Sequence, residues 1–339
     1  MEFITLERSS DNKIEQLTKK QVLAMCHRGL GQDVQIELVQ ELAGGTFNTT
    51  YLVKLKDKSK LILRVAPSPT SNIYSDDVAL MRREHHIQPF FASIATLMPQ
   101  VIMTDFTHQL IDRDYMFQSF IEGDRWDEVE ANLTDDENLI LWEQLGNITR
   151  VIHSTTGENF GWPHPGPQFK RWSELVIDRF HRIGKSMQQE QLDITDFRAI
   201  VDIVQTHSLS LDEIQQPCLL HGDLWLFNIL IRQAENGPDI VGILDADRAW
   251  WGDPMADWLM FLLSVRRNET AWEKPQAVFW AAYGRREQNK VTLFREEVYN
   301  AMHLGSVRVW YSRNKDLDKV TRAGQELKNI VQILPELIA

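Results

Sequence analysis

An aspartate, an asparagine and a second aspartate have the residue types and the spacing that indicate chemistry in this sequence. Asp223 lies in a predicted tight turn, and Asn228 follows five residues later, directly before the apolar run 229–231. A segment rich in turn-forming residues separates this run from a second apolar run, which ends next to Asp245. Two short apolar runs joined in this way predict a β-hairpin, so Asp245 should return to the neighbourhood of Asp223 and Asn228.

Phosphoryl transfer is the chemistry that this group suits, because it needs oxygen ligands for Mg²⁺ and a group that orients the attacking hydroxyl. Asn228 and Asp245 can supply the metal ligands, with Asp247 as an additional candidate, and Asp223 can accept the proton of the hydroxyl. With His221, the order His-x-Asp-x-x-x-x-Asn followed by an Asp at a strand end is that of the protein-kinase catalytic loop. The alternative is a set of solvated turn carboxylates beside a core hairpin.

A resemblance to the aminoglycoside phosphotransferase family of kinase-like enzymes rests on two stretches of the chain. These are His-Gly-Asp-Leu-Trp-Leu-Phe-Asn at 221–228, and Asp-Ala-Asp at 245–247 followed by Gly-Asp-Pro at 252–254 and Asp257. The family usually has an aromatic residue and an acid after the metal-binding aspartate. Here Ala246 replaces the aromatic residue and Asp247 keeps the acid. The first stretch is also similar to fructosamine kinases of the same superfamily, and the resemblance extends over residues 35–335.

The resemblance implies an α+β, protein-kinase-like fold with two lobes. A strand-rich N-lobe with the nucleotide-binding sheet is expected over residues 1–121. A mostly helical C-lobe with the catalytic loop, the metal site and the substrate-binding helices is expected over residues 122–339. In such a fold Asp223 is the catalytic base, and His221 and Asp257 brace the loop around it.

The activity that the resemblance implies is transfer of the γ-phosphate of ATP or GTP, with Mg²⁺, to a hydroxyl group of a small molecule. The first expectation is a cationic acceptor, such as an aminoglycoside-like antibiotic or an amino alcohol. A fructosamine-type or other sugar kinase is the alternative, and a nucleotide-binding pseudokinase is the alternative of a different class. A protein kinase is disfavoured because the Asp-Phe-Gly and Ala-Pro-Glu elements are absent from the sequence.

The elements that must hold the nucleotide are predicted in the first third of the chain. Strands over 34–42, 50–55 and 61–65 frame a turn with the sequence Gly44-Gly45-Thr46, whose N–H groups can cradle phosphates. Two glycines in a hairpin more often serve only to form the turn. The interpretation as a phosphate-binding turn therefore rests on its position between the first two predicted strands. Further strands are predicted over 101–103, 109–111 and 115–121. The last strand leads into the C-lobe, so backbone groups of three residues are expected to hold the adenine: Gln118, Ser119 and Phe120.

Arg64 and Glu84 are predicted to form an ion pair at the phosphates. Arg64 lies on the third strand, where the kinase fold has its phosphate-binding lysine, and arginine can bind phosphate through two nitrogens. Glu84 falls on the apolar face of a helix expected to begin at 75–77, and an acid buried there needs a partner. The alternatives are an exposed strand arginine and a surface glutamate.

The second lobe is predicted to be helical, with the acceptor site in its loops and C-terminal helices. The Pro- and Gly-rich loop 157–169, with Trp172 and Arg179 after it, resembles the family's insertion before its substrate-side helices. A helix is expected to start at 253–254, with others over 271–284, 290–313 and 316–333. His153 is interpreted as a packed histidine at a helix end.

Composition limits the partners. The 339 residues include 36 Lys and Arg and 48 Asp and Glu, and a net charge of −12 argues against nucleic acid and anionic membranes as partners. The acidic segment 126–138 could attract a polyamine-like substrate or could simply be a solvated surface. Two distant cysteines favour a reducing compartment. The charged start of the chain and the short apolar run 258–263 predict a cytoplasmic protein with no membrane partner. Residues 1–16 are expected to be frayed, and the oligomeric state stays open.

Overall fold

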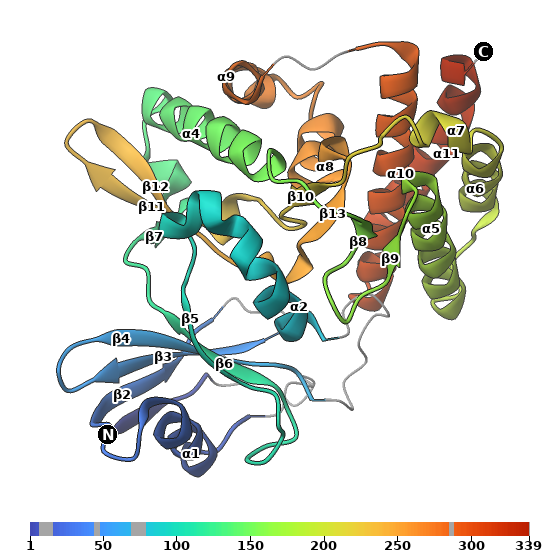
Figure 1. The fold of residues 1–339 in the computed structure, drawn as a ribbon. Coiled ribbons are helices and arrows are strands. Elements are labelled where there is room, and N and C mark those ends of the chain that lie inside the picture. Colours follow the sequence, from blue (N-terminus) through green and yellow to red (C-terminus); the bar gives the residue numbers. More distant parts are fainter. Residues whose placement is uncertain (7–15, 44–47, 69–78, 285–287, 339) are drawn as a thin grey trace.

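A β-sheet forms one end of the molecule, and helices with two small sheets form the other (Figure 1). The computed structural model describes residues 1–6, 16–43, 48–68, 79–284 and 288–338. The predicted α+β architecture with a strand-rich N-lobe and a mostly helical C-lobe is confirmed. Within the described ranges, no helix combines the length and the apolar character needed to cross a bilayer.

The N-lobe sheet has six strands in the order β1-β2-β3-β4-β6-β5. All neighbours are antiparallel except β1 and β2, which are parallel. Because β4 lies in the middle of this order, a side chain on β4 reaches the cleft between the lobes from a rigid position. The strands are β1 (Glu2–Ile4), β2 (Ile36–Glu41), β3 (Thr49–Leu55), β4 (Lys60–Val65), β5 (Val101–Asp105) and β6 (Tyr115–Ser119).

Helix α1 (Lys19–Leu30) packs against this sheet. Thr18 caps its first turn, since the Thr18 side chain accepts the N–H of Gln21 while the Gln21 side chain accepts the N–H of Thr18. One face of the helix is apolar and buried, and its Cys26 shares a core with Tyr51 of β3. This core fixes the sheet that carries the nucleotide-side residues.

Two expectations for the N-lobe are wrong. Residues 2–4 are not frayed: they pair with β2, and Phe3 stacks on Tyr51 with ring centroids 6.4 Å apart. Residues 109–111 do not form a strand, because β5 pairs directly with β6 and the intervening residues form the connection between them. Both errors concern long-range pairing, which alternation within a short stretch does not encode.

The segment between β4 and β5 joins the two lobes. Helix α2 (Leu80–Ile87) is followed by a 3₁₀-helix η1 (Gln88–Leu97) with a proline in its first turn. The expected helix start at 75–77 lies outside the described residues. Phe91 and Ile94 of η1 are buried in the same core as Trp142 of the C-lobe. The division at residues 121 and 122 therefore stays a proposal, and η1 packs with the second lobe.

The described part of the C-lobe consists mainly of helices, with seven strands in two small sheets. Its α-helices are α3 (Trp126–Val129), α4 (Asp135–His153), α5 (Trp172–Gln189), α6 (Thr195–Thr206), α7 (Ser208–Leu211), α8 (Trp258–Val265), α9 (Glu273–Tyr283), α10 (Lys290–Arg313) and α11 (Leu317–Ile338). Its 3₁₀-helices are η2 (Glu130–Asn132), η3 (Leu226–Asn228), η4 (Ala246–Arg248), η5 (Pro254–Ala256) and η6 (Thr270–Trp272). Its strands are β7 (Asp124–Arg125), β8 (Phe160–Gly161), β9 (Gln168–Phe169), β10 (Cys218–Leu220), β11 (Ile229–Ala234), β12 (Gly237–Ile243) and β13 (Trp250–Gly252).

The predicted hairpin is confirmed as β11 and β12, and β7 adds a third strand. Ile229 faces Ile243 across the pair, and the N–H of Leu244 donates to the carbonyl of Asn228 at 2.8 Å. The register therefore places the residue after Leu244 beside Asn228. The other small sheet, in the order β10-β13-β8-β9, leads the chain into the loop that contains Asp223.

The expected helices near the C-terminus are present as α9, α10 and α11, and α11 extends to Ile338. The helix expected at 253–254 begins later. A 3₁₀ turn, η5, comes first because the side chain of Asp253 accepts the N–H of Met255. Helix α8 starts only after Asp257. Helices α10 and α11 lie side by side next to α5 (Figure 1), and together with α6 they enclose one core.

Candidate active site

The loop after β10 has a backbone shape that requires glycine at its second residue. Gly222 has φ +78°, and a Cβ added there would lie 2.1 Å from the carbonyl oxygen of Arg248. Two N–H groups of the loop donate to the carboxylate of Asp257: that of His221 at 3.1 Å and that of Gly222 at 2.8 Å. These two hydrogen bonds to Asp257 thus fix the backbone immediately before Asp223.

Asp257 is fully buried and keeps its charge through several donors. Burial raises the pKa of its carboxyl, but hydrogen bonds and nearby charge, chiefly from His153, outweigh burial and leave the pKa below its ordinary value. The Nε2 atom of His153 lies 3.1 Å from the carboxylate, and Nδ1 lies 2.9 Å from the hydroxyl of Tyr283. Sequence reasoning missed this link, since His153 and Asp257 are 104 residues apart and no local pattern joins them.

Asp223 and Asn228 are in direct contact, as the spacing predicted. The amide nitrogen of Asn228 donates to the Asp223 carbonyl at 2.8 Å and to its carboxylate at 3.2 Å. The amide oxygen of Asn228 is then oriented away from these acceptors and is the group that can bind a metal. Burial raises the pKa of Asp223 to about 7, with the charge of Arg248 lowering it and that of Asp245 raising it further. A carboxyl in this range suits proton transfer near neutral pH.

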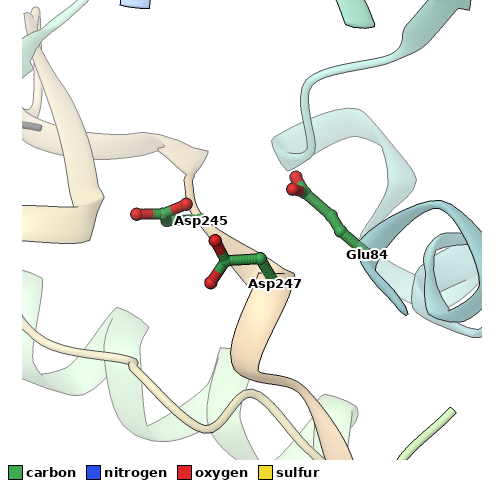
Figure 2. A group of neighbouring side chains, drawn as sticks. All are labelled: Glu84, Asp245 and Asp247. Atoms are coloured by element: carbon green, nitrogen blue, oxygen red, sulfur yellow. The ribbon is translucent and has the colours of Figure 1, made fainter. Parts of the chain in front are cut away.

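Three carboxylates from both lobes converge opposite this loop. Figure 2 shows Glu84 of α2 directed toward Asp245 and Asp247, which follow β12. One oxygen of each carboxylate lies within 4.8 Å of the others. Asp245 has φ +62°, a left-handed conformation that is unfavourable for aspartate and that occurs at functional turns.

Arg64 joins these carboxylates. Its Nη1 lies 2.6 and 2.7 Å from the two oxygens of Glu84, so the predicted ion pair is present. Its Nη2 lies 2.5 Å from Asp245 and 3.4 Å from Asp247, a contact that the sequence did not predict. Arg64 is buried, and burial by itself would lower its pKa, but the charges of Glu84, Asp245 and Asp247 outweigh burial and raise it. One arginine thus links α2 to the segment after β12.

Asp247 is the most enclosed of the three carboxylates. Only 3% of it is exposed, and its Oδ2 accepts a hydrogen bond from the Asn48 amide at 3.4 Å. Burial, followed by the charge of Asp245, raises its pKa well above the ordinary value. A group in this state gains most from a cation, because a positive charge at this position restores the ionised form.

Of the residues predicted to hold the nucleotide, some lie outside the described ranges and others are described. Gly44, Gly45 and Thr46 lie outside the described residues. Gln118 points its side chain at Glu84, with Nε2 donating to Oε1 at 3.1 Å, a role that its predicted backbone contact did not include. Ser119 donates its N–H to the carbonyl of Gln100 at 2.9 Å, so that N–H is already used in pairing.

A cleft of about 1760 Å³ lies between the lobes, and Arg64, Asp223, Asn228, Asp245 and Asp247 line it. Its N-lobe side is lined by apolar residues such as Ile62 and by residues 118–121. Trp225 and Phe227 also line the cleft, and their rings stack with centroids 4.1 Å apart. Apolar and aromatic side chains beside carboxylates have the chemistry that a nucleotide site needs.

The side chains present fit a divalent metal. Arg64 occupies both oxygens of Glu84, which leaves oxygens of Asp245, Asp247 and Asn228 as ligands. Hard oxygen donors of this kind suit Mg²⁺. A cation bound there would favour the ionised forms of these carboxylates.

The proteins to which this chain is similar are phosphotransferases and kinases. The model of the phosphotransferase enzyme family, APH, matches residues 38–294. A protein of Vibrio cholerae serotype O1 named "Probable ketoamine kinase" is 24% identical over 242 residues, which are 67% of this chain and 73% of that protein.

Among solved structures, a thermostable mutant of aminoglycoside phosphotransferase APH(4)-Ia, in a ternary complex with AMP-PNP and hygromycin B, has a TM-score of 0.65 at 15% identity. The alignment covers 92% of this chain and 98% of that one. The GDP and kanamycin complex of APH(2")-IIIa has a TM-score of 0.61 at 17% identity, with the same coverage. At these identities the likeness is one of fold. Together with the family match over most of the chain, it shows that the chain belongs to the phosphotransferase enzyme family.

Proposed function

We propose that this phosphotransferase moves the γ-phosphate of ATP or GTP to a hydroxyl group of a small molecule, with Mg²⁺ at Asn228 and Asp245. The observation that carries the proposal is the position of Arg64. Its contacts with Glu84 and Asp245 join the nucleotide-side sheet to the metal-side loop at one end of one cleft. Phosphoryl transfer depends on this kind of positioning together with charge neutralisation.

The roles of the side chains follow from their positions. Asp223 accepts the proton of the acceptor hydroxyl as the hydroxyl oxygen attacks the γ-phosphorus. The bond from this phosphorus to the bridging oxygen breaks, and the nucleoside diphosphate leaves. Asn228 donates a hydrogen bond to the Asp223 carboxylate. Arg64 binds phosphate oxygens, and Glu84 and Gln118 orient Arg64. Mg²⁺ would supply charge neutralisation of the phosphates, with Asp247 close enough to assist. His221 and Asp257 brace the loop, and backbone groups from Ser119 to Phe120 are the proposed adenine contacts.

The acceptor class is proposed from the relatives. The solved structures named above hold a nucleotide together with hygromycin B or kanamycin, and the Vibrio cholerae relative is named for ketoamines. All three acceptors carry sugar hydroxyls, so a sugar derivative is the acceptor that we favour. A ketoamine is preferred over an aminoglycoside, because the relative named for it has the higher sequence identity. The contact of Asn228 with Asp223, and that of Arg64 with Asp245, support catalysis over a pseudokinase.

The test is nucleotide consumption with a panel of ketoamines, aminoglycosides and amino alcohols, with ATP and GTP in parallel. We expect consumption that depends on Mg²⁺ and on at least one sugar-containing acceptor, with the phosphorylated product seen by ³¹P NMR. Nucleotide binding without acceptor-dependent turnover across the panel would instead favour the pseudokinase.

A further inference from the structure

Two aromatic side chains of the catalytic loop line the cleft and remain accessible. Trp225 and Phe227 lie between Asp223 and Asn228 in the sequence, and both line the cleft. Leu224, which precedes them, is fully buried, whereas Trp225 is half-buried and Phe227 is 44% exposed. The loop therefore buries Leu224 and leaves both aromatic rings at the cleft. Accessible aromatic rings in a cleft are a feature of ligand-binding sites.

The two rings are held in place by their neighbours. They stack with an angle of 29° between their planes, and the guanidinium of Arg125 lies 5.3 Å from the Phe227 ring. Arg125 is itself fixed by two hydrogen bonds to the carboxylate of Asp127, at 2.9 and 2.6 Å. A side chain that is already ordered loses little freedom when a ligand binds, which favours affinity. The indole face opposite Phe227 is the surface that this pair can offer to a ligand.

The backbone of the loop ties Trp225 to the proposed catalytic base. The N–H of Asn228 donates to the carbonyl of Trp225 at 2.9 Å, and the Asn228 side chain donates to the carboxylate of Asp223 at 3.2 Å. Asn228 thus holds the indole-bearing residue and the base in one turn. Two residues of chain span at most about 7 Å, so the Cα atoms of Asp223 and Trp225 are no further apart. An acceptor whose hydroxyl lies at Asp223 therefore lies beside Trp225.

Charged side chains along the C-lobe side of the cleft are balanced within the protein. Four basic residues that line the cleft form ion pairs: Arg182 with Asp178, Arg313 with Glu190, Lys319 with Asp316, and Arg322 with Glu326. These pairs favour neither a cationic nor an anionic acceptor, because each charge already has a partner. The acidic segment 126–138, which could have attracted a polyamine, does not contribute to the described lining of the cleft. An uncharged group fits this surface better than the cationic acceptor expected from the sequence.

The face of an indole carries partial negative charge, which attracts the weakly positive C–H bonds of a sugar ring. We propose that Trp225 binds the acceptor by this contact: the C–H face of an uncharged sugar ring packs on the indole face opposite Phe227, while a hydroxyl of the same molecule lies at Asp223. The inference rests on the proposed function and adds the residue that selects the acceptor ring. Phe227 and Arg125 are positioning residues that hold the indole.

A binding measurement tests this contact without turnover. Saturation-transfer difference NMR with D-fructose, an uncharged sugar, and with spermidine, a cation without a ring, needs no nucleotide hydrolysis. We expect transfer from aromatic protons of the wild-type protein to the C–H protons of fructose, and transfer at least about 5-fold weaker with Trp225→Leu, as loss of one ring contact gives. Transfer to fructose that does not depend on Trp225, or dependence on Trp225 for spermidine alone, would overturn the proposal.

Further variants assign the effect to the ring of Trp225. Trp225→Phe keeps a smaller ring and should retain part of the transfer, which also guards against misfolding of the Leu variant. Trp310→Leu is the matched control, because Trp310 of α10 is 47% exposed and lines the same cleft outside the catalytic loop. It removes the same ring and should leave transfer to fructose unchanged. A loss that follows Trp310 in place of Trp225 would refute the assignment.

Kinetics with a phosphorylated acceptor separate the ring contact from the nucleotide site. Trp225→Leu should raise the KM for the acceptor at least about 5-fold and change kcat by less than about 2-fold, because the contact is made before and during transfer. The KM for the nucleotide should stay unchanged. A rise in the nucleotide KM in place of the acceptor KM would assign Trp225 to the nucleotide and refute the inference, while the proposed function would stand. If no acceptor is phosphorylated but fructose binds through Trp225, the proposed function fails and the sugar-binding surface stands.

Discussion

At the scale of single residues, Arg64 has more contacts than the kinase comparison implied. It binds Glu84 through one terminal nitrogen and Asp245 through the other. The ion pair with Glu84 could be predicted from an acid on an apolar helical face and a basic residue on a strand. The contact with Asp245 could not, because it joins positions 181 residues apart through a turn that the sequence does not specify.

The first prediction concerns this clamp. Glu84→Ala should raise the KM for the nucleotide about 10-fold by releasing Arg64, and Arg64→Ala should do the same. The double variant should be little worse than either single one, because both remove the same interaction. Arg64→Lys should retain part of the affinity, since lysine keeps the charge but cannot reach two carboxylates at once. Strict additivity in the cycle would mean that the two residues act separately.

The second prediction concerns the proposed metal ligand. Asp245→Ala should abolish the Mg²⁺ dependence of nucleotide binding, because it removes a charged oxygen ligand. Calorimetric titration of nucleotide with and without Mg²⁺ measures this. Asp318→Ala removes an exposed carboxylate outside the cleft and is the control. A wild-type Mg²⁺ response in Asp245→Ala would exclude Asp245 as the ligand.

At the scale of elements, local sequence patterns predicted the hairpin and the long helices. They did not predict the hydrogen bonds between distant elements that support the loop containing Asp223. The hairpin β11 and β12 follows from two apolar runs and one turn, all within 15 residues. The support of the catalytic loop comes instead from His153 on α4 and from Asp257 before α8. Tyr283 of α9 completes it. The hydrophobic periodicity within each of these segments does not indicate that the segments contact one another.

The third prediction concerns the loop backbone. Gly222→Ala should lower kcat by at least about 10-fold, because the added Cβ would clash with the Arg248 carbonyl and strain a residue at positive φ. Nucleotide binding should change little, since Arg64 and Asp245 lie on other segments. Gly184→Ala in the middle of α5 is the control, because its Cβ would meet only ordinary contacts at 3.8 Å. Equal turnover of both variants would show that the loop tolerates the displacement.

At the scale of the whole molecule, two lobes face one cleft. The N-lobe provides apolar residues and Arg64, whereas α5, α10 and α11 of the C-lobe provide arginines and lysines, several of which are paired with nearby acids. The packing of η1 into the C-lobe core ties the lobes together close to Glu84. Fold class, lobe order and the convergence of Asp223, Asn228 and Asp245 could be predicted from the sequence. The ion pairs along the C-lobe side of the cleft could not all be predicted, because residues such as Glu190 and Arg313 lie on helices distant in the chain.

The fourth prediction is a pH dependence of stability centred on His303 in α10. Burial, together with the charge of Arg179, lowers the pKa of its imidazole from 6.5 to about 4, and its Nε2 lies 2.9 Å from the carbonyl of Ala256. The folded state thus favours neutral His303. As the pH falls from 6.5 to 4, the unfolded chain binds the proton first, so stability decreases, by up to about 3 kcal/mol.

Chemical denaturation of the wild type and of His303→Gln between pH 7 and pH 4 measures this contribution. Glutamine keeps a donor for the Ala256 carbonyl but does not titrate. The free energy of unfolding of the wild type should therefore fall more steeply with decreasing pH than that of the variant. Parallel curves would show that His303 titrates alike in both states.

The central claim is that Asp223 accepts a proton from an acceptor hydroxyl while nucleotide and metal are held by other residues. Single-turnover transfer of a ³²P-labelled γ-phosphate from the nucleotide to the acceptor, measured for the wild type and for Asp223→Asn, tests it most directly. The variant should transfer phosphate roughly 10²–10⁴-fold more slowly. Its nucleotide affinity in the presence of Mg²⁺ should match that of the wild type. Transfer by Asp223→Asn at the wild-type rate would contradict the assignment of Asp223. So would a defect of this variant in nucleotide binding rather than in the transfer step.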